Sequence, residues 1–250
     1  MDDRADFEKD IREKALQMAA DRELQRLVLD ATALSDRYGS TYFWKWLGLP
    51  IVQLPDDIVT IQEIIWETRP QMIIETGFAR GGSVILYSSL LRLLGEGLVV
   101  SVDIDVRAHN RQAVMEHPCG DRITFVEGSS TLPETFDRVR ALVPDGARVM
   151  AVLDSDHTHD HVLEELRLYG QLVTEGQFLV VCDTSIEDGP PAADRPRGWG
   201  PGNSPRTALD VYLQESDRFQ PDQWLDSKIL VASSRGGYLR CVKPWIPDAG

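Results

Sequence analysis

The chain has 250 residues, of which 42% are hydrophobic, and this is the size and composition of one α/β domain. The formal net charge of −14 disfavours nucleic acid as a partner, because a phosphate backbone repels a surface of the same sign. The chain contains no apolar run long enough to span a membrane, and its acidic N-terminus is unlike a signal peptide. We therefore expect a cytoplasmic protein with no membrane contact and with reduced cysteines.

The N-terminal part of the sequence is expected to lie outside the α/β core. Residues 5–35 carry apolar side chains at helical spacing and predict one or two helices. These helices would form a cap or an oligomer interface, or would simply pack on the core. Residues 40–56 are aromatic and broken by prolines, as in a connector. We divide the chain into a helical extension, 1–56, and a main domain, 57–250, and expect a homo-oligomer.

The main domain begins with a helix over 57–68 and then alternates between strands and helices. The predicted strands are 72–76, 98–104, 122–128, 149–156 and 178–184, and the predicted helices between them are 82–95, 107–116, 131–142 and 158–173. A helix over 206–216 follows, and then a hairpin of two strands joined by the turn Arg235-Gly236-Gly237. This order predicts a Rossmann-like α/β fold, with a mostly parallel seven-stranded sheet that ends in an antiparallel hairpin.

A glycine-rich turn follows the first predicted strand. It reads Glu75-Thr76-Gly77-Phe78-Ala79-Arg80-Gly81-Gly82-Ser83, which departs from the G-x-G-x-x-G of nicotinamide-binding proteins. Methyltransferases use the same strand–turn–helix unit with an acidic residue before the first glycine. We therefore expect S-adenosylmethionine here, with Glu75 near its amino group, although a plain βα turn is the alternative. The expected binding residues are Glu75, Thr76, Gly77, Phe78, Gly81 and Ser83.

The next two strands end in polar residues that suit the rest of this cofactor. Asp103 ends the second strand, where a carboxylate can accept hydrogen bonds from both ribose hydroxyls. Asp105 is a nearby competitor, and a helix cap is the other reading of Asp103. Ser129 and Ser130 follow the third strand, beside the expected adenine position, and a helix N-cap explains them equally well.

The most informative segment is Asp154-Ser155-Asp156-His157-Thr158-His159-Asp160-His161, after the fourth strand. It is one residue short of the H-x-H-x-D-H pattern of metallohydrolases, so we favour another metal site. Asp154, which also faces the expected cofactor, and Asp183, which ends the next strand, would lie side by side and suit Mg²⁺. Such a metal would orient an acceptor with two vicinal hydroxyls, and His157 would take the proton as general base. We expect His159 and His161 to be exposed to solvent.

The stretch from Ser185 to Pro205 is rich in glycine, proline and charge, and it predicts a loop over the active site. Trp199 within it would stack on a sugar face, or it is an incidental exposed tryptophan.

The run from Ile73 to Lys243 resembles the cephalosporin hydroxylase/rhamnosyl O-methyltransferase family of antibiotic biosynthesis. The likeness is carried by the segments IIETGFARGGS, VSVDID, LDSDHTHDHVLEEL, LVVCDT and SSRGGYLRCVK. It implies Mg²⁺-assisted transfer of a methyl group from S-adenosylmethionine to a hydroxyl, often on the deoxysugar of a glycosylated small molecule, with S-adenosylhomocysteine as product. It further implies Asp154 and Asp183 as metal ligands, His157 as the base and Asp183 as an acceptor contact.

The chain departs from the family pattern at one position, where Cys182-Asp183 replaces Glu-Asp. A thiol is a poor ligand for Mg²⁺, so Cys182 is a doubtful member of the metal site. Two other classes stay open from the sequence. One is a metal-dependent oxygenase or a nicotinamide enzyme, and the other is a binding protein without catalysis.

Overall fold

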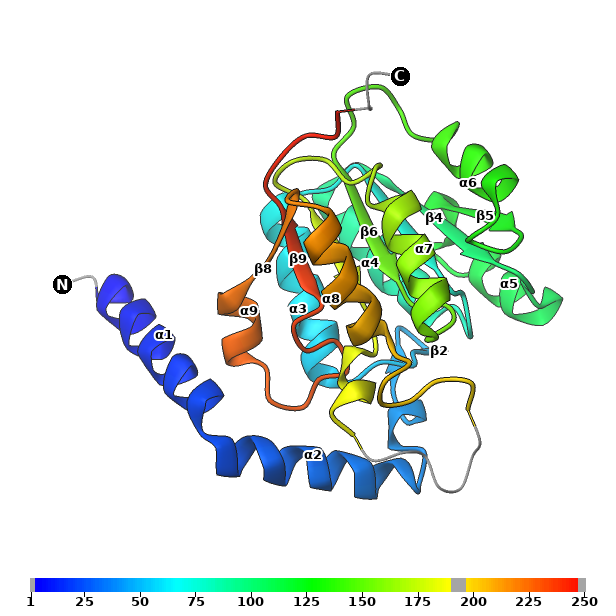
Figure 1. Ribbon diagram of the computed structural model, residues 1–250. Coiled ribbons are helices and arrows are strands. Elements are labelled where there is room, and N and C mark those ends of the chain that lie inside the picture. Colours follow the sequence, from blue (N-terminus) through cyan, green and yellow to red (C-terminus); the bar gives the residue numbers. More distant parts are fainter. Residues whose placement is uncertain (1–2, 190–196, 247–250) are drawn as a thin grey trace.

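The structure is a computed structural model that describes residues 3–189 and 197–246. A seven-stranded sheet runs through its centre in the order β5-β4-β3-β6-β7-β9-β8 (Figure 1). The strands from β3 to β7 are parallel, and β9 and β8 are antiparallel to their neighbours. This confirms the predicted sheet. The strands are β3 (Met72–Thr76), β4 (Leu98–Asp103), β5 (Ile123–Glu127), β6 (Val149–Leu153), β7 (Phe178–Val181), β8 (Phe219–Pro221) and β9 (Tyr238–Cys241).

Helices cover both faces of the sheet and form two hydrophobic cores. One core lies beneath α3 (Pro55–Thr68), α4 (Gly82–Leu94), α5 (Ala108–Met115) and α9 (Gln223–Lys228). The other lies beneath α6 (Pro133–Arg140), α7 (His159–Tyr169) and α8 (Pro205–Glu215). Strands β3, β6 and β7 are buried along their whole length because both of their faces are covered. This explains the unbroken apolar sequences of β6 and β7, whereas β3 ends in the polar pair Glu75-Thr76.

The first strand of the predicted C-terminal hairpin is misplaced. The antiparallel partner of β9 is β8, at Phe219–Pro221, whereas the residues from Asp226 onward belong to α9 and an irregular segment. Side chains take over the role of a partner strand in that segment. Asp56 Oδ2 accepts from the amides of Leu230 and Val231, and Asp57 Oδ2 accepts from the amide of Ser233. The backbone is thereby satisfied without a strand.

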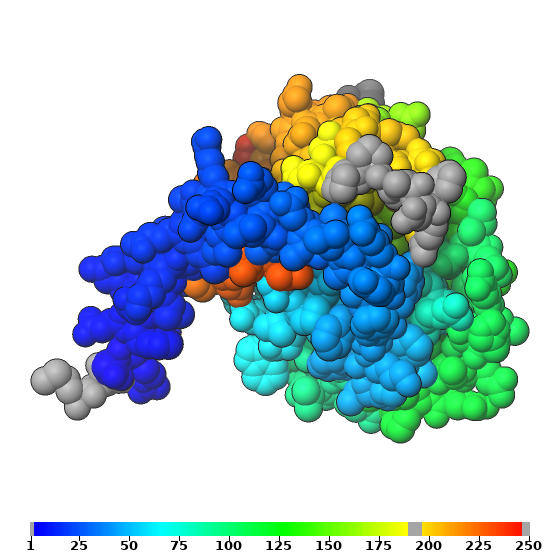
Figure 2. Space-filling view, turned by 90° about the horizontal axis from the view of Figure 1, so that it is seen from below, coloured from blue at the N-terminus to red at the C-terminus, as the bar shows by residue number. Residues whose placement is uncertain are grey.

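The N-terminal helices α1 (Arg4–Ala20) and α2 (Arg22–Asp36) form an arm that projects from the main body (Figures 1 and 2). Ala15 is the buried residue of α1, and α2 has none. The guanidinium of Arg12 lies 4.4 Å from the ring centroid of Trp224 and ties α1 to α9. Phe7, Leu16, Leu27 and Leu34 are each more than half exposed, so the arm carries apolar surface that the described chain does not cover.

A short connector leads from the arm to the sheet. It contains a 3₁₀ turn, η1 (Ser40–Tyr42), and a two-stranded ribbon of β1 (Lys45–Trp46) and β2 (Leu49–Pro50). The indole of Trp46 donates to Ser89 Oγ at 3.0 Å, which fixes the ribbon on α4. In the described part of the chain, no helix has the length and apolar character that a bilayer span requires.

Candidate functional site

The glycine turn lies where the strand order reverses, between β3 and β6. Ligands of open α/β sheets bind at the carboxyl ends of strands at such a point. Gly77 has a φ of +90°, and a Cβ there would lie 1.9 Å from the carbonyl oxygen of Asp154. A Cβ on Gly82 would lie 2.3 Å from the carbonyl oxygen of Pro50. The glycines therefore serve close packing between backbone segments, in addition to any approach of a ligand.

Asp103 organises this turn at the end of β4. Its Oδ2 accepts from the amide of Phe78 at 2.7 Å, and its Oδ1 accepts from the amide of Asp105 at 2.9 Å. Each carboxylate oxygen keeps a further lone pair for a ligand. The Phe78 side chain is buried edge-on against Phe125, at 5.0 Å between ring centroids, so only its backbone faces the turn. Asp103 lines a cleft of about 540 Å³ together with Tyr42, Val52, Ala79, Arg80, Ile104, Asp105 and Arg107.

Glu75 is completely buried beneath the turn. Its Oε2 lies 3.5 Å from the donor Ser101 Oγ, and its Oε1 has no hydrogen-bond partner among the described residues. Burial raises the pKa of Glu75 to about 8, while the hydroxyls of Ser83 and Tyr87 act in the opposite direction. A buried carboxyl with an unused acceptor atom suits a cationic hydrogen-bond donor. Thr76, also buried, lies with its Oγ1 3.3 Å from the Asp154 amide.

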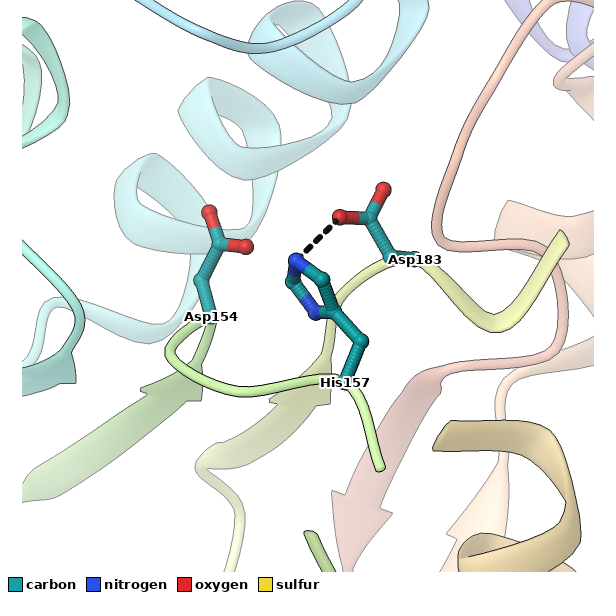
Figure 3. A group of neighbouring side chains, drawn as sticks. All are labelled: Asp154, His157 and Asp183. Atoms are coloured by element: carbon teal, nitrogen blue, oxygen red, sulfur yellow. Dashed lines mark ion pairs between the residues drawn. The ribbon is translucent and has the colours of Figure 1, made fainter. Parts of the chain in front are cut away.

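Asp154, His157 and Asp183 come together at the ends of β6 and β7 (Figure 3). One potential ligand atom from each lies within 4.8 Å of the other two. His157 Nε2 is 3.2 Å from Asp183 Oδ2. Asp183 has a left-handed φ of +56°, and the next residues hold this conformation, because Thr184 Oγ1 donates to the Arg235 carbonyl at 2.7 Å. The group has the composition of a small metal site.

The electrostatics of this group favour a bound cation. Burial raises the pKa of Asp154 well above its ordinary value, and the negative charges of Asp183, Glu75 and Asp57 raise it further. Among the described residues, His157 is the side chain that can pair with Asp183 as a positive charge when its ring is protonated. A divalent cation or an ammonium group would relieve this repulsion and ionise Asp154.

Cys182 does not join the group. Its side chain is 6% exposed and packs in the core beneath α3 and α4. Burial, followed by the charges of Asp154 and Asp183, raises the pKa of its thiol well above the ordinary value. A protonated, buried thiol is no ligand for a hard cation. The two aspartates are thus the carboxylates that the described chain offers at this point.

Trp199 packs against His157. The two rings meet edge to face with centroids 4.9 Å apart, and the Arg197 guanidinium lies 5.0 Å from the indole. Asn203 Oδ1 accepts from the amide of His159 at 2.8 Å, which ties this part of the predicted loop to the start of α7. On its other side the loop begins with a 3₁₀ turn, η3 (Thr184–Glu187). Residues 190–196 of the predicted loop lie outside the described residues.

The expectation that His159 and His161 face solvent is wrong. His159 Nδ1 lies 2.8 Å from Thr207 Oγ1 on α8, and His161 Nε2 lies 3.0 Å from Ser130 Oγ. Both side chains are partly buried. Ser130 therefore holds His161 through its side chain, while Ser129 Oγ lies 3.1 Å from Thr131 Oγ1. The spacing of His161 and Glu165 by one helical turn signals only their own ion pair, at 3.4 Å between Nε2 and Oε1, and not the contact with Ser130.

Comparison with known proteins identifies the family of this chain and agrees with its fold. The family model described as rhamnosyl O-methyltransferase/CmcI matches residues 38–242. A rhamnosyl O-methyltransferase of Mycobacterium tuberculosis is 31% identical over 207 residues, which are 81% of this chain and 80% of that protein. Its counterpart in Mycobacterium leprae is 30% identical over 182 residues, covering 71% of this chain and 75% of that protein.

A solved structure of CmcI, described as its Mg-SAM form, superposes with a TM-score of 0.58 and 19% identity, covering 81% of this chain and 78% of that one. At this identity the likeness supports the fold. The chain therefore belongs to the rhamnosyl O-methyltransferase/CmcI family, which confirms the resemblance expected from the sequence and places the protein among the S-adenosylmethionine-dependent O-methyltransferases.

Proposed function

We propose that this protein transfers the methyl group of S-adenosylmethionine to a sugar hydroxyl, on a rhamnose-like deoxysugar of a glycosylated secondary metabolite. The observation that carries the proposal is the group of Asp154, His157 and Asp183 beside the glycine turn. The names of the relatives support a rhamnosyl acceptor. Acidic metal ligands and a base next to a cofactor cleft are what deprotonation of a hydroxyl requires.

The residues around the turn fit the cofactor. The unpaired Oε1 of Glu75 and the raised pKa of Asp154 favour a cationic amino-acid end, and the Asp103 carboxylate keeps acceptor capacity for a ribose at the cleft. Bound S-adenosylmethionine supplies an already activated methyl group. The work left to the protein is to align the acceptor oxygen and to remove one proton.

Asp154 and Asp183 fit Mg²⁺, which prefers carboxylate oxygens and keeps several waters. A metal held there supplies positive charge that binds vicinal hydroxyls and lowers their pKa. Asp183 uses Oδ2 for His157 and keeps Oδ1 for a cation. The same group holds one imidazole, so the two-histidine iron site of oxygenases does not form among the described residues.

His157 is the general base of this proposal. A carboxylate only accepts hydrogen bonds, so the contact with Asp183 assigns the proton of the neutral ring to Nε2 and leaves Nδ1 basic. Asp183 then stabilises the imidazolium that forms when Nδ1 takes the acceptor proton. Trp199 packs edge to face against the ring and helps to hold its orientation.

The exposed apolar residues of the arm support assembly into a homo-oligomer. Leu27 and Leu34 lie seven residues apart on α2, on one stripe of that helix. A second copy of this chain is the occupant that we infer for this stripe. Sedimentation of the wild type and of a Leu27→Glu/Leu34→Glu variant tests it, and a wild-type monomer would contradict it.

Calorimetry with S-adenosylhomocysteine tests the cofactor assignment. Asp103→Ala should weaken binding by about 1.5–3 kcal/mol, the usual range for hydrogen bonds to a charged group. Asp105→Ala is the matched control, because the Asp105 carboxylate is exposed and pairs with Arg107. Equal affinities in the wild type and Asp103→Ala would remove Asp103 from the cofactor site.

A further inference from the structure

Helix α7 carries a buried carboxylate that the proposed reaction does not use. Glu165 is 0% exposed, and its Oε1 accepts from Ser155 Oγ at 2.7 Å. Its Oε2 is buried and has no partner in the described part of the chain. Its ionisable partner is His161, whose Nε2 lies 3.4 Å from Oε1. A carboxylate buried in this way is costly unless its neighbours are held in place around it.

The hydrogen bonds assign a proton to His161 Nε2. This atom lies 3.1 Å from Ser155 Oγ and 3.0 Å from Ser130 Oγ. Ser155 has one hydroxyl proton, and it donates that proton to Glu165. Its oxygen can therefore only accept from His161, so Nε2 is an N–H donor.

The Nε2–H group of His161 lies between the loop that follows β5 and the loop that follows β6. Ser155 directly follows Asp154, after β6, and Ser130 follows β5. Tyr169 adds a second tie, because its hydroxyl donates to the Ser130 carbonyl at 3.0 Å. His161, Glu165 and Tyr169 are four residues apart along α7, so one face of this helix holds both loops.

We propose that His161 is a positioning residue whose Nε2–H fixes the loop after β5 against the loop after β6, so that cofactor affinity and metal affinity both depend on it. The inference rests on the proposed function, with the metal on Asp154, and on the expectation from the sequence that the adenine lies beside Ser129 and Ser130. His161 does not touch the reacting atoms. It acts through Ser155 and Ser130.

The test compares two substitutions of His161, one that removes the hydrogen-bond donor and one that keeps a donor near the same position. His161→Ala removes the N–H, whereas the amide of His161→Gln supplies an uncharged N–H near the position of Nε2. Affinity is measured for S-adenosylhomocysteine by calorimetry, and for Mn²⁺ alone by electron paramagnetic resonance. We expect His161→Ala to weaken both by about 10-fold, the equivalent of one hydrogen bond of about 1.4 kcal/mol. His161→Gln should stay close to the wild type, as should Asp160→Asn, an exposed control on the same helical turn.

A second variant guards against loss of folding. Ser155→Ala removes the hydroxyl that links His161 to Glu165, and it should weaken both ligands in the same direction. The double variant Ser155→Ala/His161→Ala should lose little more affinity for either ligand than each single variant does, since the two residues act in one network. The inference is overturned if His161→Ala lowers the melting temperature but leaves both affinities unchanged, or if His161→Gln restores neither. A wild type that binds neither probe contradicts the proposed function instead.

Discussion

His157 Nε2 lies 3.2 Å from Asp183 Oδ2, so the imidazole is joined to one of the two carboxylates that we propose as metal ligands. This contact links proton removal to acceptor binding, because the Asp183 side chain both contacts the proposed base and is a proposed metal ligand. The base, the metal ligands and the residues that pack on them can each be tested by separate substitutions.

Replacement of His157 should affect turnover far more than binding. His157→Ala should lower kcat by about 10²–10⁴-fold, the span usual for loss of a general base. Affinity for S-adenosylhomocysteine should stay nearly constant. A decrease of less than 10-fold would remove His157 from the mechanism.

Replacement of Asp154 should abolish the response to metal. Turnover of the wild type should require Mg²⁺, and Asp154→Asn should lower kcat far more than cofactor affinity. Cys182→Ala is the matched control, because its buried thiol lies outside the group of ligand atoms. It should lower stability but keep the Mg²⁺ dependence of the rate. Full activity of the wild type after exhaustive chelation would contradict the metal site.

The raised pKa of Asp154 predicts how the Mg²⁺ dependence of the rate changes with pH. The pKa is raised, so protons compete with the metal for the carboxylate. The Mg²⁺ concentration that gives half-maximal rate should therefore fall as the pH rises. A half-saturation that does not change with pH would mean that Asp154 is already ionised without a metal.

Glu75 should make the stability of the free protein depend on pH. Its pKa is raised from 4.5 to about 8, so the folded state holds a proton that the unfolded state releases. The stability is fully present below the unfolded value and is lost as the pH rises toward 8, with a slope of up to about 1.4 kcal/mol per pH unit. Denaturant titrations from pH 5 to 8 should show this slope in the wild type and a flatter one in Glu75→Gln.

The same residue should release a proton when the cofactor product binds. A cationic amino group near Glu75 favours its ionised form, so binding of S-adenosylhomocysteine at pH 7 should release a proton. Calorimetry in buffers of different ionisation enthalpy measures that release. Glu75→Gln should abolish it, and equal release from both proteins would place the amino group elsewhere.

Trp199 should act through His157 as well as through the acceptor. The edge-to-face contact fixes the imidazole, so Trp199→Ala should lower kcat and raise KM for the acceptor, with cofactor affinity unchanged. Trp199→Phe keeps an aromatic ring and should therefore change kcat and KM less than Trp199→Ala does. A variant that changes only KM would indicate that the indole stacks on the sugar and does not position His157.

The sequence was sufficient for the sheet, the glycine turn and the pairing of Asp154 with Asp183. Each depends on local patterns or on the rule that parallel strands end at one edge. It was insufficient for the first strand of the C-terminal hairpin, because Asp56 and Asp57 satisfy the backbone there from a helix some 170 residues earlier in the chain. It was also insufficient for His161, since contacts with Ser130 and Ser155 depend on how α7 packs over two loops. Side-chain networks of this kind are decided by tertiary packing.

Methyl transfer itself tests the central claim most directly. The wild type and Asp154→Asn are incubated with S-adenosylmethionine labelled in its methyl group, Mg²⁺ and a panel of rhamnosides, and the glycosides are analysed by mass spectrometry. We expect labelled methyl on a sugar hydroxyl with the wild type, its loss after chelation, and little or none with Asp154→Asn. Label that appears on a non-sugar position, or at equal rates with both proteins, would contradict it.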